Sequence, residues 1–383
     1  MKKLILIGLC LGFAVIFCAG TALAADTLKI GFHAPLTGFA ASDGKSASEG
    51  AKLAVAQINA AGGVNGKMLE LVIYDDQAKA AQAIPIANKL IGQDEVVIGV
   101  SGSYSGPTRS AAGVFQEAGL PYISAYAIHP DITRAGDFVF RTSFLGEVQG
   151  RGGAKLIGDI LGKKKVVIIT LQNDFGKSLA AGFEEMAPTY GIEIVGNYQY
   201  SIKDRQFGSI VAKVKADNPE AIYASGYYFT AGPLVSQLRA AGVNCPIIGQ
   251  EGYDSQKFIE IAGKAAEGII ITTSLDRDAT VPETADFIKA FEKQAGFKAD
   301  MVAASGHTAV KVAADAIQRA GSTDPVKILA ALKTTDLKVS TGQIRFNALG
   351  EVMKAVQIQV VKDGNWHHYA VIDDPELLAP PDK

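Results

Sequence analysis

Short runs of β-forming residues alternate with helical stretches, and this alternation restricts the fold more than any other feature of the sequence. The first strands are predicted at Leu28–Phe32, Leu69–Tyr74, Val96–Gly99, Tyr122–Ser124 and Phe138–Arg141. Helices are predicted between the first four, at Ser46–Ala61, Ala80–Ile91 and Thr108–Ala118. Such alternation is typical of a parallel sheet with helices on both faces. We therefore predict an α/β fold.

The same alternation starts again after residue 146, as a second unit of similar size. After a helix at Glu147–Leu161, strands are predicted at Lys165–Thr170, Glu193–Tyr198, Ala221–Ala224, Ile247–Gly249 and Gly268–Thr272. The predicted helices of this unit are Lys177–Met186, Phe207–Ala216 and Gly232–Ala241. Two such units leave a cleft between their strand ends, where open α/β sheets bind small ligands.

The remaining third of the chain has a different pattern. Residues 283–333 are predicted to be mainly helical, with amphipathic spacing over Thr308–Arg319. Ala355–Val361 and Trp366–Val371 predict a β-hairpin. The Pro-rich stretch Leu378–Lys383 predicts a loose tail.

Residues 1–24 have the order of a secretory signal peptide. A basic head precedes the apolar run Leu4–Gly20, and Ala22-Leu23-Ala24 is a small-x-small cleavage site. A retained membrane anchor is the alternative, although the apolar run is only about long enough to cross a bilayer. A lipoprotein at Cys18 is less consistent, because the bulky Phe17 precedes it. We expect cleavage, export and a mature chain that begins at Ala25 and is long enough for two domains.

Charge and cysteine content exclude several classes of function. The formal net charge is −2 at pH 7, so nucleic acid is not an expected partner. Outside the signal only Cys245 remains, which can form neither an internal disulfide nor a CxxC metal site. His367 and His368 would point to opposite faces of a strand and would bind one ion poorly. We expect neither a metal nor a cofactor.

Two candidate binding groups follow predicted strands. The segment Ser101–Thr108 opens a helix, whose free N–H groups and dipole can hold a carboxylate, and Ser105 adds a hydroxyl. The segment has the spacing of neither a Walker loop nor a GxGxxG dinucleotide loop, and an empty turn is about equally consistent with it. Glu251 follows Ile247–Gly249 and could pair with an ammonium group, or it could be an ordinary surface acid.

Aromatic residues follow two other strands of the second unit. Tyr227 and Tyr228 come after Ala221–Ala224, and Phe175 comes after Lys165–Thr170. They could form the walls of a pocket or pack locally.

No catalytic constellation stands out in the sequence. It contains no G-x-S-x-G elbow, no H-E-x-x-H motif and no lone cysteine with a plausible base. We therefore expect no enzymatic activity. An exported enzyme that uses the cleft is the alternative, and turnover that Glu251→Gln abolishes would support it.

Seven short segments have an order and spacing found in one protein family. They are Ala34-Pro-Leu-Thr-Gly38, Ala51–Gly66, Tyr74-Asp-Asp76, Ser105-Gly106 with Ala118-Gly-Leu-Pro121, Arg141-Thr142 and Gly249-Gln-Glu-Gly252. Over essentially the whole mature chain, the sequence resembles the periplasmic substrate-binding proteins of ABC transporters. More narrowly, it resembles the leucine/isoleucine/valine-binding branch, the type I periplasmic binding proteins.

This resemblance implies a fold and a division into lobes. The family fold has two Rossmann-like lobes with parallel central sheets, which are joined by three crossovers and close on a ligand by hinge motion. By this resemblance, lobe 1 comprises residues 25–146 and 276–350. Lobe 2 comprises residues 147–275 and 351–383.

The resemblance also implies roles for single residues. In amino-acid binders of the family, a serine at the position of Ser105 and backbone N–H groups near Tyr126 hold the α-carboxylate of the ligand. An acid at the position of Glu251 and the region near Tyr227 hold the α-ammonium. An aromatic residue at the position of Phe175, usually Tyr, closes over the ligand.

Two positions depart from the family pattern. Ile128 stands where the amino-acid binders usually have a threonine that bonds the zwitterion. Asp43 stands where the aliphatic-specific members have an aromatic wall, so the side-chain pocket is expected to be more polar or differently shaped.

The function implied by the resemblance is transport of a small solute. A monomeric periplasmic receptor would deliver an amino acid, with a branched-chain or aliphatic one as first choice, to ABC permease subunits. The alternatives are a binder of another small carboxylate or amide, such as an aromatic acid or a polar amino acid, and a ligand-sensing module for a membrane receptor.

Overall fold

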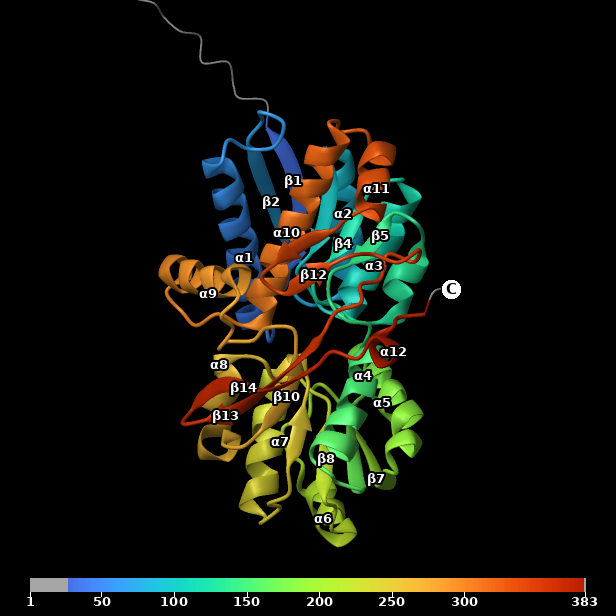
Figure 1. Ribbon diagram of the computed structural model, residues 1–383, viewed down its shortest axis with the longest axis vertical. Coiled ribbons are helices and arrows are strands. Elements are labelled where there is room, and N and C mark those ends of the chain that lie inside the picture. The colour runs from blue at the N-terminus through green and yellow to red at the C-terminus, as the bar shows by residue number, and fades with distance from the viewer. Residues whose placement is uncertain (1–26, 382–383) are drawn as a thin grey trace, which may run out of the picture.

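The computed structural model describes residues 27–381, which form two α/β lobes, one above the other in Figure 1. The predicted signal peptide at residues 1–24 lies outside the described residues. Among residues 27–381, no helix combines the length and the apolar character needed to span a bilayer.

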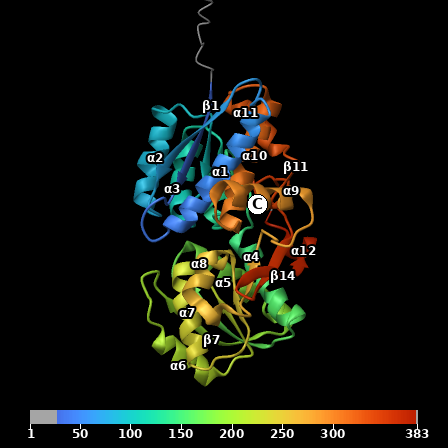
Figure 2. The same ribbon diagram turned by 90° about the vertical axis from the view of Figure 1, so that its left-hand side faces the viewer.

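The first lobe is built on a parallel sheet in the order β2-β1-β3-β4-β5. Its strands are β1 (Leu28–Ala34), β2 (Leu69–Asp75), β3 (Ile98–Ser101), β4 (Tyr122–Ser124) and β5 (Val139–Arg141). The three helices that connect the first four strands are α1 (Ala41–Ala60), α2 (Ala80–Gly92) and α3 (Ser105–Glu117). Because strand crossovers are right-handed, α1 covers one face of the sheet and α2 and α3 cover the other (Figure 2).

The second lobe repeats this winding in a seven-stranded sheet. Strands β6 (Lys165–Leu171), β7 (Glu193–Tyr200), β8 (Ala221–Ala224), β9 (Ile247–Gly249) and β10 (Ile270–Thr273) are parallel, in the order β7-β6-β8-β9-β10. The predicted hairpin is present as β13 (Val356–Lys362) and β14 (Asn365–Ile372), and β13 pairs antiparallel with β10. The helices are α4 (Gly146–Lys155), α5 (Asp174–Met186), α6 (Gly208–Asp217), α7 (Tyr228–Ala240) and α8 (Gln256–Ala262).

The remaining elements lie between β10 and β13 or after the hairpin. They are α9 (Pro282–Ala295), α10 (Met301–Ala320), α11 (Pro325–Lys333), β11 (Leu337–Val339), β12 (Gly342–Ile344) and α12 (Pro375–Leu378). Short 3-10 turns occur at Pro130–Ala135, Pro188–Tyr190, Glu251–Tyr253 and Gly263–Ala266, and a π-helical turn at Leu156–Ile160. The chain therefore passes between the lobes three times, at residues 142–145, 274–281 and 345–355.

Two glycines let α1 and α10 pack unusually closely in the first lobe (Figure 2). A Cβ atom on Gly50 would lie 2.0 Å from the carbonyl oxygen of Ala303, and one on Gly306 would lie 2.4 Å from that of Ala47. A side chain at either position would push the helices apart. The late segment of the chain is thus packed against the early one.

Helix α10 lies within the region predicted to be mainly helical, and it begins at Met301 because the Asp300 carboxylate accepts the N–H of Ala303 at 2.8 Å and caps the helix. Two predicted helix starts are wrong. Helices α1 and α7 begin earlier than predicted, at Ala41 and Tyr228.

The prediction of a loose C-terminal tail is also wrong for residues 378–381. The side chain of Leu378 is buried. The Nδ2 atom of Asn347 donates a hydrogen bond of 3.1 Å to the carbonyl of Pro381. Proline suits the first turn of a helix, so Pro375 starts α12 after the capping Asp374 and brings the apolar residues of α12 against the protein.

Candidate ligand-binding site

Each sheet has a switch point at the C-terminal ends of its strands, where the connections leave toward opposite faces. In the order 2-1-3-4-5 this point lies between the first and third strands, and it is the usual ligand crevice of such sheets. In the first lobe it lies between β1 and β3, whose following segments carry Asp43 and Ser105. In the second lobe it lies between β6 and β8, which are followed by Phe175 and Tyr227.

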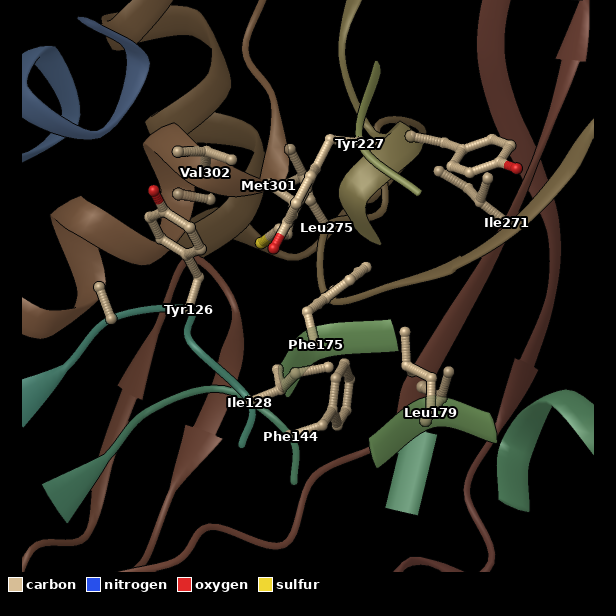
Figure 3. Packing of buried hydrophobic residues seen from close by; sticks show 14 of the residues in the cluster. Tyr126, Ile128, Phe144, Phe175, Leu179, Tyr227, Ile271, Leu275, Met301 and Val302 are labelled. Carbon is tan, nitrogen blue, oxygen red and sulfur yellow. The ribbon is translucent and has the colours of Figure 1, made fainter. Parts of the chain in front are cut away.

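A small cavity of about 20 Å³ is lined by residues from both switch points, so the closed lobes leave little empty space between them. Its lining residues are Asp43, Tyr104, Ser105, Tyr126, Ala127, Phe175, Tyr227, Glu251, Gly252, Met301 and Val302. The structure thus brings together six of the seven residues proposed from the sequence. The seventh, Ile128, does not line the cavity and lies beside Phe144 (Figure 3).

One end of the cavity offers hydrogen-bond donors. Ser105 is the first residue of the 13-residue helix α3, and Tyr104 before it makes no capping hydrogen bond through its side chain. Within residues 27–381, neither the N–H groups of Ser105 and Gly106 nor the buried Ser105 hydroxyl has a hydrogen-bond partner. A helix N-terminus combines free N–H groups with the positive end of the dipole, so this end suits a carboxylate.

Tyr126 offers the cavity its backbone N–H group and its ring, but not its hydroxyl. That hydroxyl donates a 2.9 Å hydrogen bond to the carbonyl of Gly102 and is therefore already engaged. The N–H groups of Tyr126 and Ala127 make no hydrogen bond to other described residues. They add two further donors beside the helix start.

The second lobe supplies an acid. Glu251 lies in the short turn after β9 and is 3% exposed. Burial raises the pKa of its carboxyl to about 8, against the opposing effect of the Lys354 ammonium. Its Oε2 atom has no hydrogen-bond partner among residues 27–381, and a buried acid without a donor is unfavourable. An ammonium group placed here would compensate that cost.

Gly252 keeps the Glu251 turn close to the opposite wall of the site. A Cβ atom on Gly252 would lie 2.1 Å from the carbonyl oxygen of Gly226 and 3.1 Å from the ring of Phe175. Any larger residue would therefore displace the acid or the ring.

Three aromatic rings stack across the lobes. The Tyr227 ring lies parallel to that of Tyr104, with centroids 4.1 Å apart, and also stacks on Phe175 at 4.9 Å. Figure 3 shows Phe175, Tyr227 and Tyr126 arranged around the site. Tyr104 comes from the first lobe and the other two members of the stack from the second, so the lobes are closed on each other.

Further contacts between the lobes accompany the stack. The Tyr228 hydroxyl donates a 3.1 Å hydrogen bond to the carbonyl of Phe39. Arg109 of α3 lies 3.2 Å from the carboxylate of Asp174 in α5. Both contacts lie beside the cavity and would break if the lobes separated.

Asp43 is a second acid in the cavity wall. Its side chain is 5% exposed, and its Oδ2 atom accepts a 2.6 Å hydrogen bond from the Tyr104 hydroxyl. Burial raises the pKa of the Asp43 carboxyl to about 8, and the nearby carboxylates of Asp300 and Asp254 add to the increase against the effect of Tyr104.

The neighbouring acids and bases have partners within the protein. Asp254 pairs with Arg277 and accepts a 2.5 Å hydrogen bond from the Thr273 hydroxyl. Lys354 is buried and donates a 3.4 Å hydrogen bond to the carbonyl of Thr142; burial lowers the pKa of its ammonium to about 7, against the effect of Glu251. No group of three or more His, Cys, Asp or Glu side chains in the described part of the chain is arranged to hold a metal ion.

Sequence reasoning did not single out four functional positions. Tyr104, Met301 and Val302 line the cavity, and Lys354 adds charge near Glu251. The capping Asp300 before an apolar run is a helix-start signal that could have located the first turn of α10. Nothing local in the sequence indicates that Lys354 is buried.

Comparison with known proteins agrees with this architecture. Residues 27–365 match the family model described as periplasmic binding protein. The chain is 32% identical over 346 residues to the leucine-, isoleucine-, valine-, threonine- and alanine-binding protein of Pseudomonas aeruginosa, which covers 89% of this chain and 92% of the relative.

Solved structures show the same fold. One is the branched-chain amino acid transporter substrate-binding protein of Streptococcus pneumoniae in complex with isoleucine, with a TM-score of 0.85, 30% identity and coverage of 90% of this chain and 99% of that one. Another is an ABC transporter substrate-binding protein of Desulfitobacterium hafniense in complex with leucine, with a TM-score of 0.78, 26% identity and coverage of 90% and 100%. The chain belongs to the periplasmic binding protein family.

Proposed function

We propose that this protein is the solute-binding component of an ABC transporter and captures an amino acid between its two lobes. One observation carries the proposal: unpaired backbone and hydroxyl donors face the cavity at the start of α3, while the unpaired acid Glu251 lines it from the other lobe. This arrangement complements an α-carboxylate and an α-ammonium on one small molecule. The relatives named above bind amino acids, which supports the same ligand class here.

Binding would be coupled to closure because the two charged ends of the ligand contact different lobes. A ligand shifts a conformational equilibrium only through contacts that differ between the two states. We propose that residues 25–146 and 276–350 move as one lobe and residues 147–275 and 351–383 as the other. The closed receptor would deliver its ligand, as a monomer in the periplasm, to membrane permease subunits.

Isothermal titration with matched analogues tests the ligand class. Leucine is expected to bind, and 4-methylpentanoate, which lacks the ammonium, and 3-methylbutylamine, which lacks the carboxylate, should each bind at least tenfold more weakly. Each analogue leaves one charged group of the site without its counterpart. If folded protein gives no binding heat with any of the twenty amino acids, the proposal is wrong.

The affinity for an amino acid is expected to rise between pH 6 and pH 8. Burial raises the pKa of the Glu251 carboxyl to about 8, so the free protein holds a proton there that must leave before the carboxylate can pair with an ammonium. Binding therefore releases a proton, and the association constant should increase by up to about tenfold per pH unit and level off above pH 8.

Calorimetry in buffers of different ionisation enthalpy measures this proton release directly. A flat affinity profile with no proton release would show that Glu251 is already ionised in the free protein. The same titration on Glu251→Gln serves as the control and should lose the dependence that belongs to this residue.

A further inference from the structure

The cavity contains one more acid than a simple zwitterion needs. Asp43 and Glu251 both line it, from opposite lobes, and both are at least 95% buried. If Glu251 pairs with the α-ammonium, Asp43 faces another part of the ligand. Its position at the start of α1, after the switch-point strand β1, places it on the wall opposite the Glu251 turn.

The Tyr227 ring lines the same cavity as these two acids. Burial raises the pKa of the Tyr227 hydroxyl, and the carboxylates of Asp43 and Glu251 both add to that increase, so both lie within electrostatic reach of it. Tyr227 is also stacked on Tyr104, the partner of Asp43. The cavity is therefore walled by the aromatic rings of Tyr104, Tyr126, Phe175 and Tyr227 and carries two acids.

Asp43 lacks a cationic partner. Its one hydrogen bond within residues 27–381 comes from the neutral Tyr104 hydroxyl, and no Lys, Arg or His nitrogen in that range lies within 4.0 Å of its carboxylate. The two buried cations nearby have other partners, because Arg277 pairs with Asp254 and Lys354 donates a 3.4 Å hydrogen bond to the carbonyl of Thr142. Without a cation, burial favours the protonated Asp43 carboxyl, and a cationic group on the ligand would stabilise its ionised form.

Tyr104 fixes which carboxylate oxygen is free. Its hydroxyl holds Oδ2 of Asp43 at 2.6 Å, and its ring is held by the parallel stack with Tyr227. The Oδ1 atom has no hydrogen bond to any described residue, so it is free to accept one from the ligand. Tyr104 is a positioning residue for this contact.

We propose that Asp43 determines specificity by binding a cationic group on the side chain of the ligand, an inference that rests on the proposed amino-acid function. The ligand class is a diamino acid, with its α-ammonium at Glu251 and its side-chain ammonium at Asp43. A wholly aliphatic side chain would instead bury the Asp43 carboxylate against methyl groups. This assignment differs from the isoleucine and leucine bound in the two solved relatives named above.

Calorimetric titration with two matched pairs of amino acids tests the assignment. Ornithine differs from norvaline, and lysine from norleucine, only by the terminal ammonium. The diamino member of at least one pair is expected to bind at least tenfold more tightly than its neutral partner at pH 8. Asp43→Asn should remove that preference, lowering the affinity for the diamino acid at least tenfold while leaving the neutral partner unchanged or tighter.

Two further variants separate recognition from general effects. Asp286→Asn changes an exposed acid of α9 in the same lobe and should leave both affinities unchanged. Tyr104→Phe keeps the stacked ring but frees Oδ2, and should reduce the preference without abolishing binding. If Asp43→Asn fails to fold, the ratio within each matched pair on the unaltered protein still decides the question.

Failure of the inference and failure of the proposed function give different results. If norvaline and norleucine bind as tightly as ornithine and lysine, or if Asp43→Asn leaves the preference in place, the inference is overturned and the amino-acid function stands. If no amino acid binds, the proposed function is overturned and this inference with it.

Discussion

Replacing Glu251 by glutamine is expected to weaken amino-acid binding by about 2–4 kcal/mol, or roughly 30- to 1000-fold. Glutamine keeps the shape of the side chain but removes its negative charge. The α-ammonium of the ligand would then be buried without a counterion, beside the Lys354 ammonium that Glu251 now offsets. Isothermal titration at pH 8 measures the loss directly.

A matched variant and a stability measurement complete this experiment. Glu260→Gln removes an acid from the same lobe at an exposed position in α8 and should leave affinity unchanged. Thermal unfolding of Glu251→Gln, followed by circular dichroism, verifies that the variant is folded before its affinity is compared. An affinity equal to that of the unaltered protein would place Glu251 outside the ligand contacts.

Replacing Arg141 by methionine is expected to lower the free energy of unfolding by about 3–5 kcal/mol. The Arg141 guanidinium is fully buried, and its Nε and Nη2 atoms lie 2.9 and 3.1 Å from the two carboxylate oxygens of Glu351. It also donates 2.7 Å hydrogen bonds to the carbonyls of Ala127 and His129. Methionine would leave a buried acid and two buried carbonyls without their donor.

This pair joins two of the three passages between the lobes. Arg141 ends β5, immediately before the first passage, and Glu351 lies in the third. Urea denaturation followed by circular dichroism measures the loss. The control is Arg345→Met, whose ion pair with Asp336 is largely exposed, so its loss should lower the free energy of unfolding much less. Equal losses of unfolding free energy from the two substitutions would show that the buried Arg141–Glu351 pair stabilises the protein no more than an exposed pair.

Most of the secondary structure could be predicted from local sequence patterns. Strands such as β6 and β8 are short apolar runs, and the hairpin of β13 and β14 surrounds Asp363-Gly364, where both residues have positive φ. The errors lie at helix starts and at the C-terminus. Capping by Asp300 and Asp374 depends on single residues that periodicity does not register.

The candidate site could be predicted less completely. Ser105 and Glu251 could be proposed because each follows a predicted strand, and strand ends converge at one edge of a parallel sheet. Resemblance to the family added Tyr126 and pointed to Asp43, and the roles of all these residues stay predictions. No sequence pattern singled out Tyr104 within the segment Ser101–Thr108. Its hydrogen bond to Asp43 joins residues 61 positions apart in the chain.

Local order in the sequence was sufficient to predict two α/β units and the edge of each sheet at which the candidate cavity lies, because strand and helix periodicities are properties of neighbouring residues. Only the tertiary structure decided which ionisable groups are buried and which groups surround them. Burial of Lys354 near Glu251, and of Asp43 against Tyr104, arises where segments far apart in the chain exclude water from the same small volume. Desolvation depends on everything around a group, so no local pattern encodes it.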